Sequence, residues 1–138
     1  MKWLTEPLKE LEDYRYLLEN IKNKNTPVLA TGVIDVQKTQ LIYALCKEAG
    51  ATALIIGHDE ADAKSIYNDI LSLNEKASYF PAKDVIFYSA DVHSSDITRQ
   101  RFKTIDELLS GETDFVCTTA EALFERLMPK KEMIEYIF

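Results

Sequence analysis

The residues most able to do chemistry lie in an incomplete phosphate-binding loop, residues 32–39. The stretch fits the pattern G-x-x-x-x-G-K-[ST] at every fixed position except the second glycine, where Gln37 stands. Backbone N–H groups of such a loop cradle a phosphate, the lysine neutralises its charge, and the hydroxyl binds Mg²⁺. Gly32, Lys38 and Thr39 still supply three of these parts. The pattern predicts either a nucleotide site with one unusual residue or a motor fold kept as a scaffold.

Asp35 argues against phosphate binding at this loop. A carboxylate about 5 Å from a phosphate oxygen repels it by roughly 3 kcal/mol per unit charge at an effective dielectric near 20. Asp is also a favoured N-cap, and Asp35 stands directly before a helical pattern at 36–49. Our hypothesis is that Asp35 substitutes internally for the phosphate and can also pair with Lys38.

Apolar runs alternate with helical patterns along the chain. The runs that predict buried strands are 28–30, 53–56, 77–80 and 115–117. The patterns that predict helices are 5–21, 36–49, 60–73, 94–109 and 119–127. Wholly apolar strands that alternate with helices predict an α/β fold: a three-layer parallel sheet with helices on both faces, preceded by an N-terminal helix.

The same pattern of segments predicts that the chain has three regions. Residues 1–25 form the N-terminal helix, 26–129 form the α/β domain with a degenerate P-loop, and 130–138 begin a further element. The apolar segment 133–138 stops without a turn or a polar tail, so we expect a fragment of a longer protein. No Asp-Glu pair stands immediately at the end of an apolar run, so the Mg²⁺-binding and water-activating half of a motor site is missing, and we expect neither catalysis nor a cofactor in this fragment.

The composition of the chain excludes further classes of function. The net charge of −7 argues against a dedicated nucleic-acid binder, although it leaves room for a basic patch or a basic neighbouring domain. Cys46 and Cys117 lie in a predicted helix and a predicted strand, which is unlike a disulfide framework and indicates a reducing cytoplasm. His58 and His93 have no Cys/His cluster around them, so no metal site is expected. There is no signal peptide or transmembrane run.

Four aromatic residues surround the loop after the third predicted strand: Tyr79, Phe80, Phe87 and Tyr88. Long loops in compact domains are often functional, so these rings indicate either a partner surface or packing over the edge of the sheet.

Charged and hydroxyl residues near the loop edge also allow two interpretations. Arg99 and Arg101 could extend the partner surface as a basic strip, but the acidic residues around them favour a solvated helix face. Thr118 and Thr119 could contact a ligand, although threonine directly before a helix more typically caps it. Glu121 and Glu125 lie one helical turn apart and are most simply solvated charges.

The order of these segments resembles a known family. The residues that carry the resemblance are Gly32, Lys38, Thr39, then Phe80-Pro81-Ala82-Lys83-Asp84, Tyr88, Ser94-Ser95, Arg99, Arg101-Phe102-Lys103-Thr104-Ile105, and Val116-Cys117-Thr118-Thr119-Ala120-Glu121-Ala122-Leu123. They look like the N-terminal UvrB-like region, the first domain, of the bacterial transcription-repair coupling factors (Mfd). The resemblance covers roughly residues 5–129.

The resemblance implies a function that composition does not reveal. Members of the family are ATP-driven DNA translocases that displace stalled RNA polymerase and recruit the repair protein UvrA. ATP and Mg²⁺ act in a separate motor, whereas the UvrB-like module has a RecA-like fold without ATPase activity. UvrA is contacted mainly by a following domain, which would begin near Lys130. The family is cytoplasmic, and no membrane partner is implied.

Three functions follow from the sequence. The first is a non-catalytic scaffold that serves UvrA recruitment and autoinhibitory contacts with other domains of its parent chain. The second is an active nucleotide-binding half-domain of a UvrB-like or helicase ATPase. The third is a free-standing flavodoxin-like regulatory domain, for which Asp59, Asp84 and Asp91 are a loose match to the acidic residues expected at strand ends.

Overall fold

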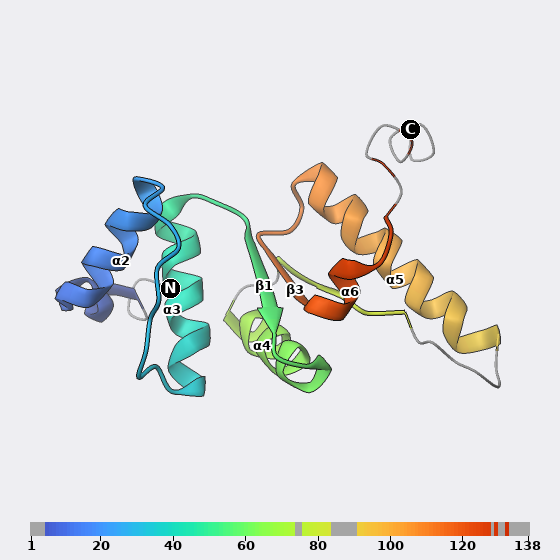
Figure 1. The fold of residues 1–138 in the computed structure, drawn as a ribbon, viewed down its shortest axis with the longest axis horizontal. Coiled ribbons are helices and arrows are strands. Elements are labelled where there is room, and N and C mark those ends of the chain that lie inside the picture. The colour runs from blue at the N-terminus through green and yellow to red at the C-terminus, as the bar shows by residue number, and fades with distance from the viewer. Residues whose placement is uncertain (1–4, 74–75, 84–90, 128, 130–131, 133–138) are drawn as a thin grey trace. The chain divides into compact units, whose positions relative to one another are not determined.

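The computed structural model describes residues 5–73, 76–83, 91–127, 129 and 132, with only the backbone at 36 and 91–95. The chain divides into two compact units, Met1–Ala53 and Leu54–Phe138. Both units are drawn in Figure 1.

The described part of the first unit consists of three helical elements. They are the 3-10 helix η1 (Glu6–Glu10), α2 (Glu12–Lys22) and α3 (Asp35–Ala49). The single helix predicted for 5–21 is wrong, because Leu11 takes an extended backbone with ψ 127° and separates η1 from α2. Helix α2 packs on α3 through the buried Tyr14. Helix α3 ends as expected at Gly50, which has φ 62° and donates its N–H to Cys46 O.

The strand predicted at 28–30 does not form. Residues 25–34 join α2 to α3 without regular structure, and Leu29 is 87% exposed. Among the described residues, no backbone–backbone hydrogen bond involves 27–33. A strand requires a neighbour to complete its ladder, and the first unit holds none among its described residues. The predicted strand-loop-helix setting of a phosphate site therefore lacks its strand.

The second unit is built on a three-stranded parallel sheet. Its elements are β1 (Ala53–Gly57), α4 (Glu60–Leu73), β2 (Ala77–Phe80), α5 (Asp91–Ser110), β3 (Phe115–Thr119) and α6 (Ala120–Phe124). The strand order is β1-β3-β2, and Ala77 of β2 pairs with Phe115 of β3. The predicted α/β class and the three strands after residue 50 are confirmed.

Different helices cover the two faces of the sheet. Val116 packs in a cluster with Phe80 and Ala122, against Ile105 of α5. Because neighbouring residues of a strand face opposite sides, Phe115 and Cys117 face the other way, where α4 packs on β3. Phe115 and Cys117 are fully buried. The core of this unit therefore lies on both sides of β3, the central strand.

Two predicted helix boundaries are wrong in the second unit. Helix α5 begins at Asp91, before the Ser94 to Asp96 start that the sequence favoured. Helix α6 ends at Phe124 rather than near 127, because Glu125 takes an extended backbone with ψ 141°. The Glu125 carboxylate accepts a hydrogen bond from Lys83 N at 2.7 Å and pairs with Arg101, and these contacts hold the residue outside the helix.

Gly57 allows β1 to approach α4 closely. A Cβ added at Gly57 would lie 2.7 Å from Ala63 N and 2.8 Å from Ala63 Cα. Since both atoms belong to the backbone, the contact cannot be relieved by a side-chain rotation. We expect Gly57→Ala to lower the free energy of unfolding by about 2 kcal/mol through overpacking, as measured by chemical denaturation.

Gly50→Ala is the matched control for that substitution. Gly50 has φ 62° with nothing within 4 Å of an added Cβ, so only backbone strain of about 1 kcal/mol is expected. A loss at Gly57 no larger than the loss at Gly50 would contradict the close contact with α4.

Candidate functional site

The predicted phosphate loop is largely absorbed into a helix. Helix α3 begins at Asp35, so only Val33 and Ile34 separate Gly32 from the first helical residue. A phosphate cradle needs several successive loop residues whose N–H groups converge, and the four residues from 35 to 38 are helical here. The expected N-cap role of Asp35 is wrong by one position, because Ile34 is the N-cap and makes no side-chain cap bond.

Backbone donors of the loop already have partners. Gln37 N donates to Ile34 O at 2.9 Å, and Lys38 N donates to the same oxygen at 3.0 Å. These bonds are the first turn of α3. They withdraw two of the N–H groups that would otherwise point at an anion. Gln37, in place of glycine, is a helical residue with an exposed side chain.

Lys38 makes the ion pair that the hypothesis on Asp35 anticipated. Lys38 Nζ lies 2.7 Å from Asp35 Oδ1, and the hydrogen bond from Lys38 lowers the pKa of the Asp35 carboxyl. The pairing is confirmed, although both side chains are open to solvent, at 48% and 95% exposure. Thr39 is buried at 4% exposure, so it is not presented to an incoming Mg²⁺. Lys38 and Thr39, the two side chains that would contact a nucleotide and its Mg²⁺, are thus engaged within the protein.

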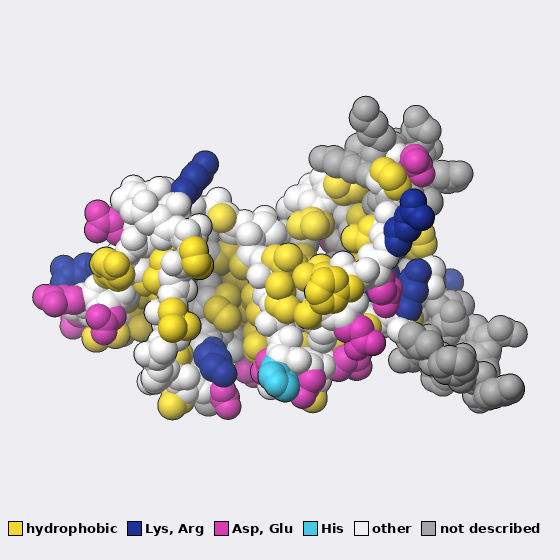
Figure 2. All heavy atoms as spheres, in the orientation of Figure 1, with side chains coloured by type: hydrophobic (Ala, Val, Ile, Leu, Met, Phe, Trp, Pro, Cys, Tyr) yellow, Lys and Arg dark blue, Asp and Glu magenta, His cyan; other side chains and the backbone are white. Residues whose placement is uncertain are grey.

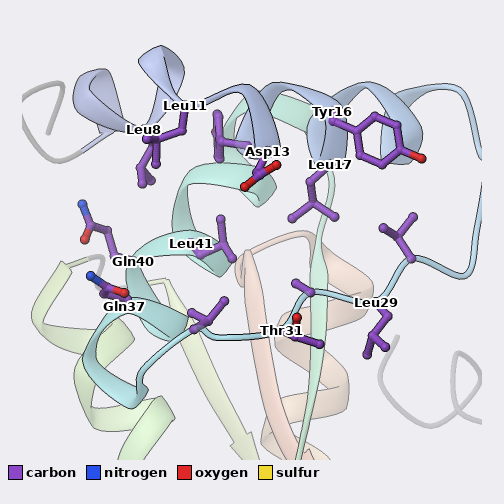
Figure 3. Close-up of a pocket in the computed structure, with 14 residues that line it drawn as sticks. Leu8, Leu11, Asp13, Tyr16, Leu17, Leu29, Thr31, Gln37, Gln40 and Leu41 are labelled. Carbon is purple, nitrogen blue, oxygen red and sulfur yellow. The ribbon is translucent and has the colours of Figure 1, made fainter.

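A cavity of about 500 Å³ lies beside the loop in the first unit. Figure 3 shows leucines of η1, α2 and α3 that point into it, together with residues of the 25–34 segment. The lining residues are Leu8, Leu11, Asp13, Tyr14, Tyr16, Leu17, Val28, Leu29, Ala30, Thr31, Val33, Gln37, Gln40 and Leu41. None of these residues is cationic and one is acidic. This lining cannot neutralise a polyphosphate, and it suits apolar groups.

Of the four described residues of the candidate partner surface, three are buried. Tyr79 and Phe80 are each 5% exposed, so these two rings belong to the core. Arg99 is exposed on α5, whereas Arg101 is only 4% exposed. The residues Phe87, Tyr88 and the rest of that loop up to 90 lie outside the described residues.

Arg101 instead holds together the loops at the end of β2 and α6. Its Nη1 donates to Pro81 O at 2.6 Å, its Nη2 lies 3.0 Å from Glu125 Oε2, and its guanidinium carbon lies 4.1 Å from the centre of the Phe80 ring. Glu125 Oε1 accepts from Lys83 N. Burial lowers the pKa of Arg101, while the Glu125 carboxylate acts in the opposite direction.

Sequence reasoning missed this network and treated Glu125 as a solvated charge. A signal was present, since Arg101 falls in the same helical stripe as Ile97 and Ile105, four residues from each. A charged residue in an apolar stripe requires a buried counter-charge, and only the fold identifies it as Glu125.

The two threonines at the end of β3, Thr118 and Thr119, serve the fold. Thr119 Oγ1 accepts from Ala122 N at 3.3 Å, so the helix-cap interpretation is confirmed. Thr118 Oγ1 donates to Phe80 O at 2.8 Å across the sheet. Glu121 is exposed on α6.

His58 and its neighbours form a helix start. Asp59 Oδ1 accepts from Asp62 N at 2.8 Å, and Asp62 Oδ2 accepts from His58 N at 2.8 Å, which caps α4. The His58 side chain is 92% exposed. Within the described part of the chain, no group of three His, Cys, Asp or Glu side chains could hold a metal ion.

Tyr79 and Cys117 carry the largest shifts in acidity. Burial, aided by the Glu60 carboxylate, raises the pKa of the Tyr79 phenol from 10 to about 12. Burial raises the pKa of the Cys117 thiol from 9 to about 12. Both folded-state values lie above the unfolded ones, so the neutral groups stabilise the fold fully below pH 9, and this contribution is lost as the pH rises through 12.

We therefore expect the free energy of unfolding to fall between pH 9 and pH 12. Denaturation at a series of pH values measures this fall. The Tyr79→Phe, Cys117→Ala double variant should show a flatter dependence, because it lacks both titrating groups. An equally steep fall in the double variant would assign the effect to other residues.

Comparison with known proteins adds one relationship. The chain is 24% identical over 128 residues to the transcription-repair-coupling factor of Bacillus subtilis (strain 168). The match covers 91% of this chain but 11% of that protein, so the chain spans a small part of the relative's length. No protein-family model and no solved structure matches the chain. No helix among the residues described is long and apolar enough to cross a membrane.

Proposed function

We propose that this chain is a nucleotide-independent interaction module of a transcription-repair coupling factor. The likeness to the Bacillus protein over 91% of the chain supports that kind of protein. The structure of the loop at residues 32–39 is the observation that supports a non-catalytic role. Helix α3 starts three residues before Lys38, and the Lys38 ammonium is paired with Asp35 at 2.7 Å.

In this proposal the module supplies contacts rather than chemistry. ATP and Mg²⁺ act in a motor located elsewhere in a longer parent chain, which would use DNA and RNA polymerase as its partners. The module, with a UvrB-like fold, serves UvrA recruitment, mainly through a following domain, and interdomain contacts that keep the resting protein closed. The apolar lining of the cavity in the first unit supports a surface for protein groups rather than for phosphates.

The alternative function is an active nucleotide-binding half-domain. The retained Gly32, Lys38 and Thr39 favour it at the level of sequence. Against it stand the early start of α3, the two N–H groups bonded to Ile34 O, and the absence of any cation from the cavity lining.

Titration with Mg-ATP separates the two functions. We expect no saturable binding to the 138-residue chain up to about 1 mM nucleotide, as measured by calorimetry or amide chemical shifts. Saturation in the micromolar range would contradict the proposal. A pull-down of UvrA with this chain, alone and joined to the domain that follows it in a parent protein, tests the recruitment role, and retention of UvrA only by the longer version is the expected result.

Gln37→Gly tests whether restoring the second glycine of the pattern is enough to create ATP binding. Because Gln37 is helical, glycine should lower the free energy of unfolding by about 0.5–1 kcal/mol and should not create ATP binding. Gln40→Gly, on the same helix, is the matched control for the helix effect. ATP binding that appears only in Gln37→Gly would support the alternative function.

A further inference from the structure

Glu125 stands at a point where the sequence favours a helix and the tertiary structure ends it. The helical pattern at 119–127 predicts that α6 continues through Leu127, yet α6 ends at Phe124 and Glu125 takes an extended backbone with ψ 141°. Among the described residues, no backbone–backbone hydrogen bond involves 126–127. Places where local preference and the fold disagree are often functional.

The residues after Phe124 are suited to a longer helix. Glu125, Arg126 and Leu127 are all strong helix formers. In a continued helix Leu127 would lie on the same face as Leu123, one turn earlier, where the two apolar side chains could pack. Figure 2 shows hydrophobic side chains gathered where Figure 1 draws α6.

Two contacts of a single carboxylate oppose the longer helix. Glu125 Oε1 accepts a hydrogen bond from Lys83 N at 2.7 Å, and Glu125 Oε2 lies 3.0 Å from Arg101 Nη2. A helix would place Glu125 on the same face as Glu121, which is exposed. A helical Glu125 would therefore lose both contacts, and the extended backbone keeps them.

Arg101 connects this carboxylate to the end of β2. Its Nη1 donates to Pro81 O at 2.6 Å, and its side chain is only 5% exposed. Strand β2 ends at Phe80, so Pro81 and Lys83 lie where the chain leaves the sheet. Arg101 and Glu125 thus tie the end of β2 to the end of α6, and all of these residues belong to the second unit.

We propose that the Glu125 carboxylate is a latch that holds α6 in the shorter of two states. In the latched state, which the structure shows, the carboxylate binds Arg101 and Lys83 N, and α6 ends before Glu125. In the released state the carboxylate leaves both groups and α6 continues through Leu127. Pro129 stops the helix there, because a proline disfavours helical backbone in the residue before it.

The latch couples two places on the module. Drawing 125–127 into the helix frees Lys83 N, and displacing Lys83 favours the longer helix, because coupling between two sites is reciprocal. Release also redirects the chain that leaves α6, since a helix advances about 1.5 Å per residue and an extended chain about 3.3 Å. This coupling goes beyond the proposed function and does not depend on whether residues 32–39 bind nucleotides.

The double variant Arg101→Met, Glu125→Leu tests the latch without leaving a buried charge. In the 138-residue chain we expect helical ¹³Cα chemical shifts at 125–127 and slower amide hydrogen exchange at Arg126 and Leu127. Exchange at Lys83 should become at least about tenfold faster, because its acceptor is gone. Opposite changes at the two places distinguish a switch from local unfolding, which speeds exchange at both.

Glu121→Ala is the matched control for the loss of a carboxylate from α6. Glu121 is exposed, so its removal should leave the shifts at 125–127 and the exchange at Lys83 unchanged.

Two substitutions at Pro129 test the coupling while every latch residue stays in place. Pro129 is exposed, and both Pro129→Ala and Pro129→Gly remove the ring that stops the helix. Alanine favours a longer helix and glycine does not, so exchange at Lys83 should be about fivefold faster in the alanine variant than in the glycine variant.

Three results would overturn the proposal. The first is an extended backbone at 125–127 in the double variant, because α6 would then end without the help of Glu125. The second is faster exchange at Lys83, Arg126 and Leu127 together in the double variant, which would indicate local unfolding. The third is equal exchange at Lys83 in the two Pro129 variants, which would show that the ends of β2 and α6 are independent.

Discussion

Glu125→Leu is expected to lower the free energy of unfolding by about 3 kcal/mol, as measured by chemical denaturation. The substitution leaves Arg101, whose side chain is 5% exposed, without its carboxylate. An uncompensated buried charge costs about 3–5 kcal/mol, and the 22% exposure of Glu125 places the expected loss at the lower end. Lys83 N also loses its acceptor.

The double variant Arg101→Met, Glu125→Leu is the control that isolates the charge. It removes both ions and puts apolar groups of similar volume in their place, so the loss should be smaller than for Glu125→Leu alone. A double variant that is as unstable as the sum of the two single variants would show that Arg101 and Glu125 do not interact.

Phe115→Ala is expected to lower the free energy of unfolding by about 3–5 kcal/mol. Phe115 is fully buried in β3, the central strand, and is among the largest completely enclosed side chains. Truncation removes its apolar area from the core and leaves a cavity that the helix packed on that face cannot fill completely. Chemical denaturation measures the effect.

Phe102→Ala is the matched control for that truncation. Phe102 is 50% exposed on α5, so the same change of side chain should alter stability by about 0.5 kcal/mol or less. Similar losses at the two positions would contradict the assignment of the core to the two faces of β3.

Much of the second unit could be predicted from the sequence, because its signals are local. The apolar runs at 53–56, 77–80 and 115–117 and the helix after Asp59 all form where periodicity indicated. Short apolar strands between amphipathic helices leave few packings other than a parallel sheet. The sequence likewise identified Thr119 as a cap, because an N-cap bond reaches only a few residues along the chain.

The candidate site was less predictable. The pattern at 32–39 was visible, and the Asp35–Lys38 pair followed from a spacing of three residues. The sequence placed the start of α3 one residue too late, at 36 instead of Asp35, since helix boundaries depend on capping contacts that several sequences can make. For the same reason the break at Leu11 was missed.

The sequence by itself determined the α/β class, the three strands of the second unit, and the pairing of Asp35 with Lys38. These conclusions rest on periodicity and on charges a few residues apart, which act before the chain is folded. Only the tertiary structure decided that residues 28–30 form no strand and that Arg101 is buried against Glu125. A ladder and a buried ion pair each depend on residues distant in sequence, so no local pattern specifies them.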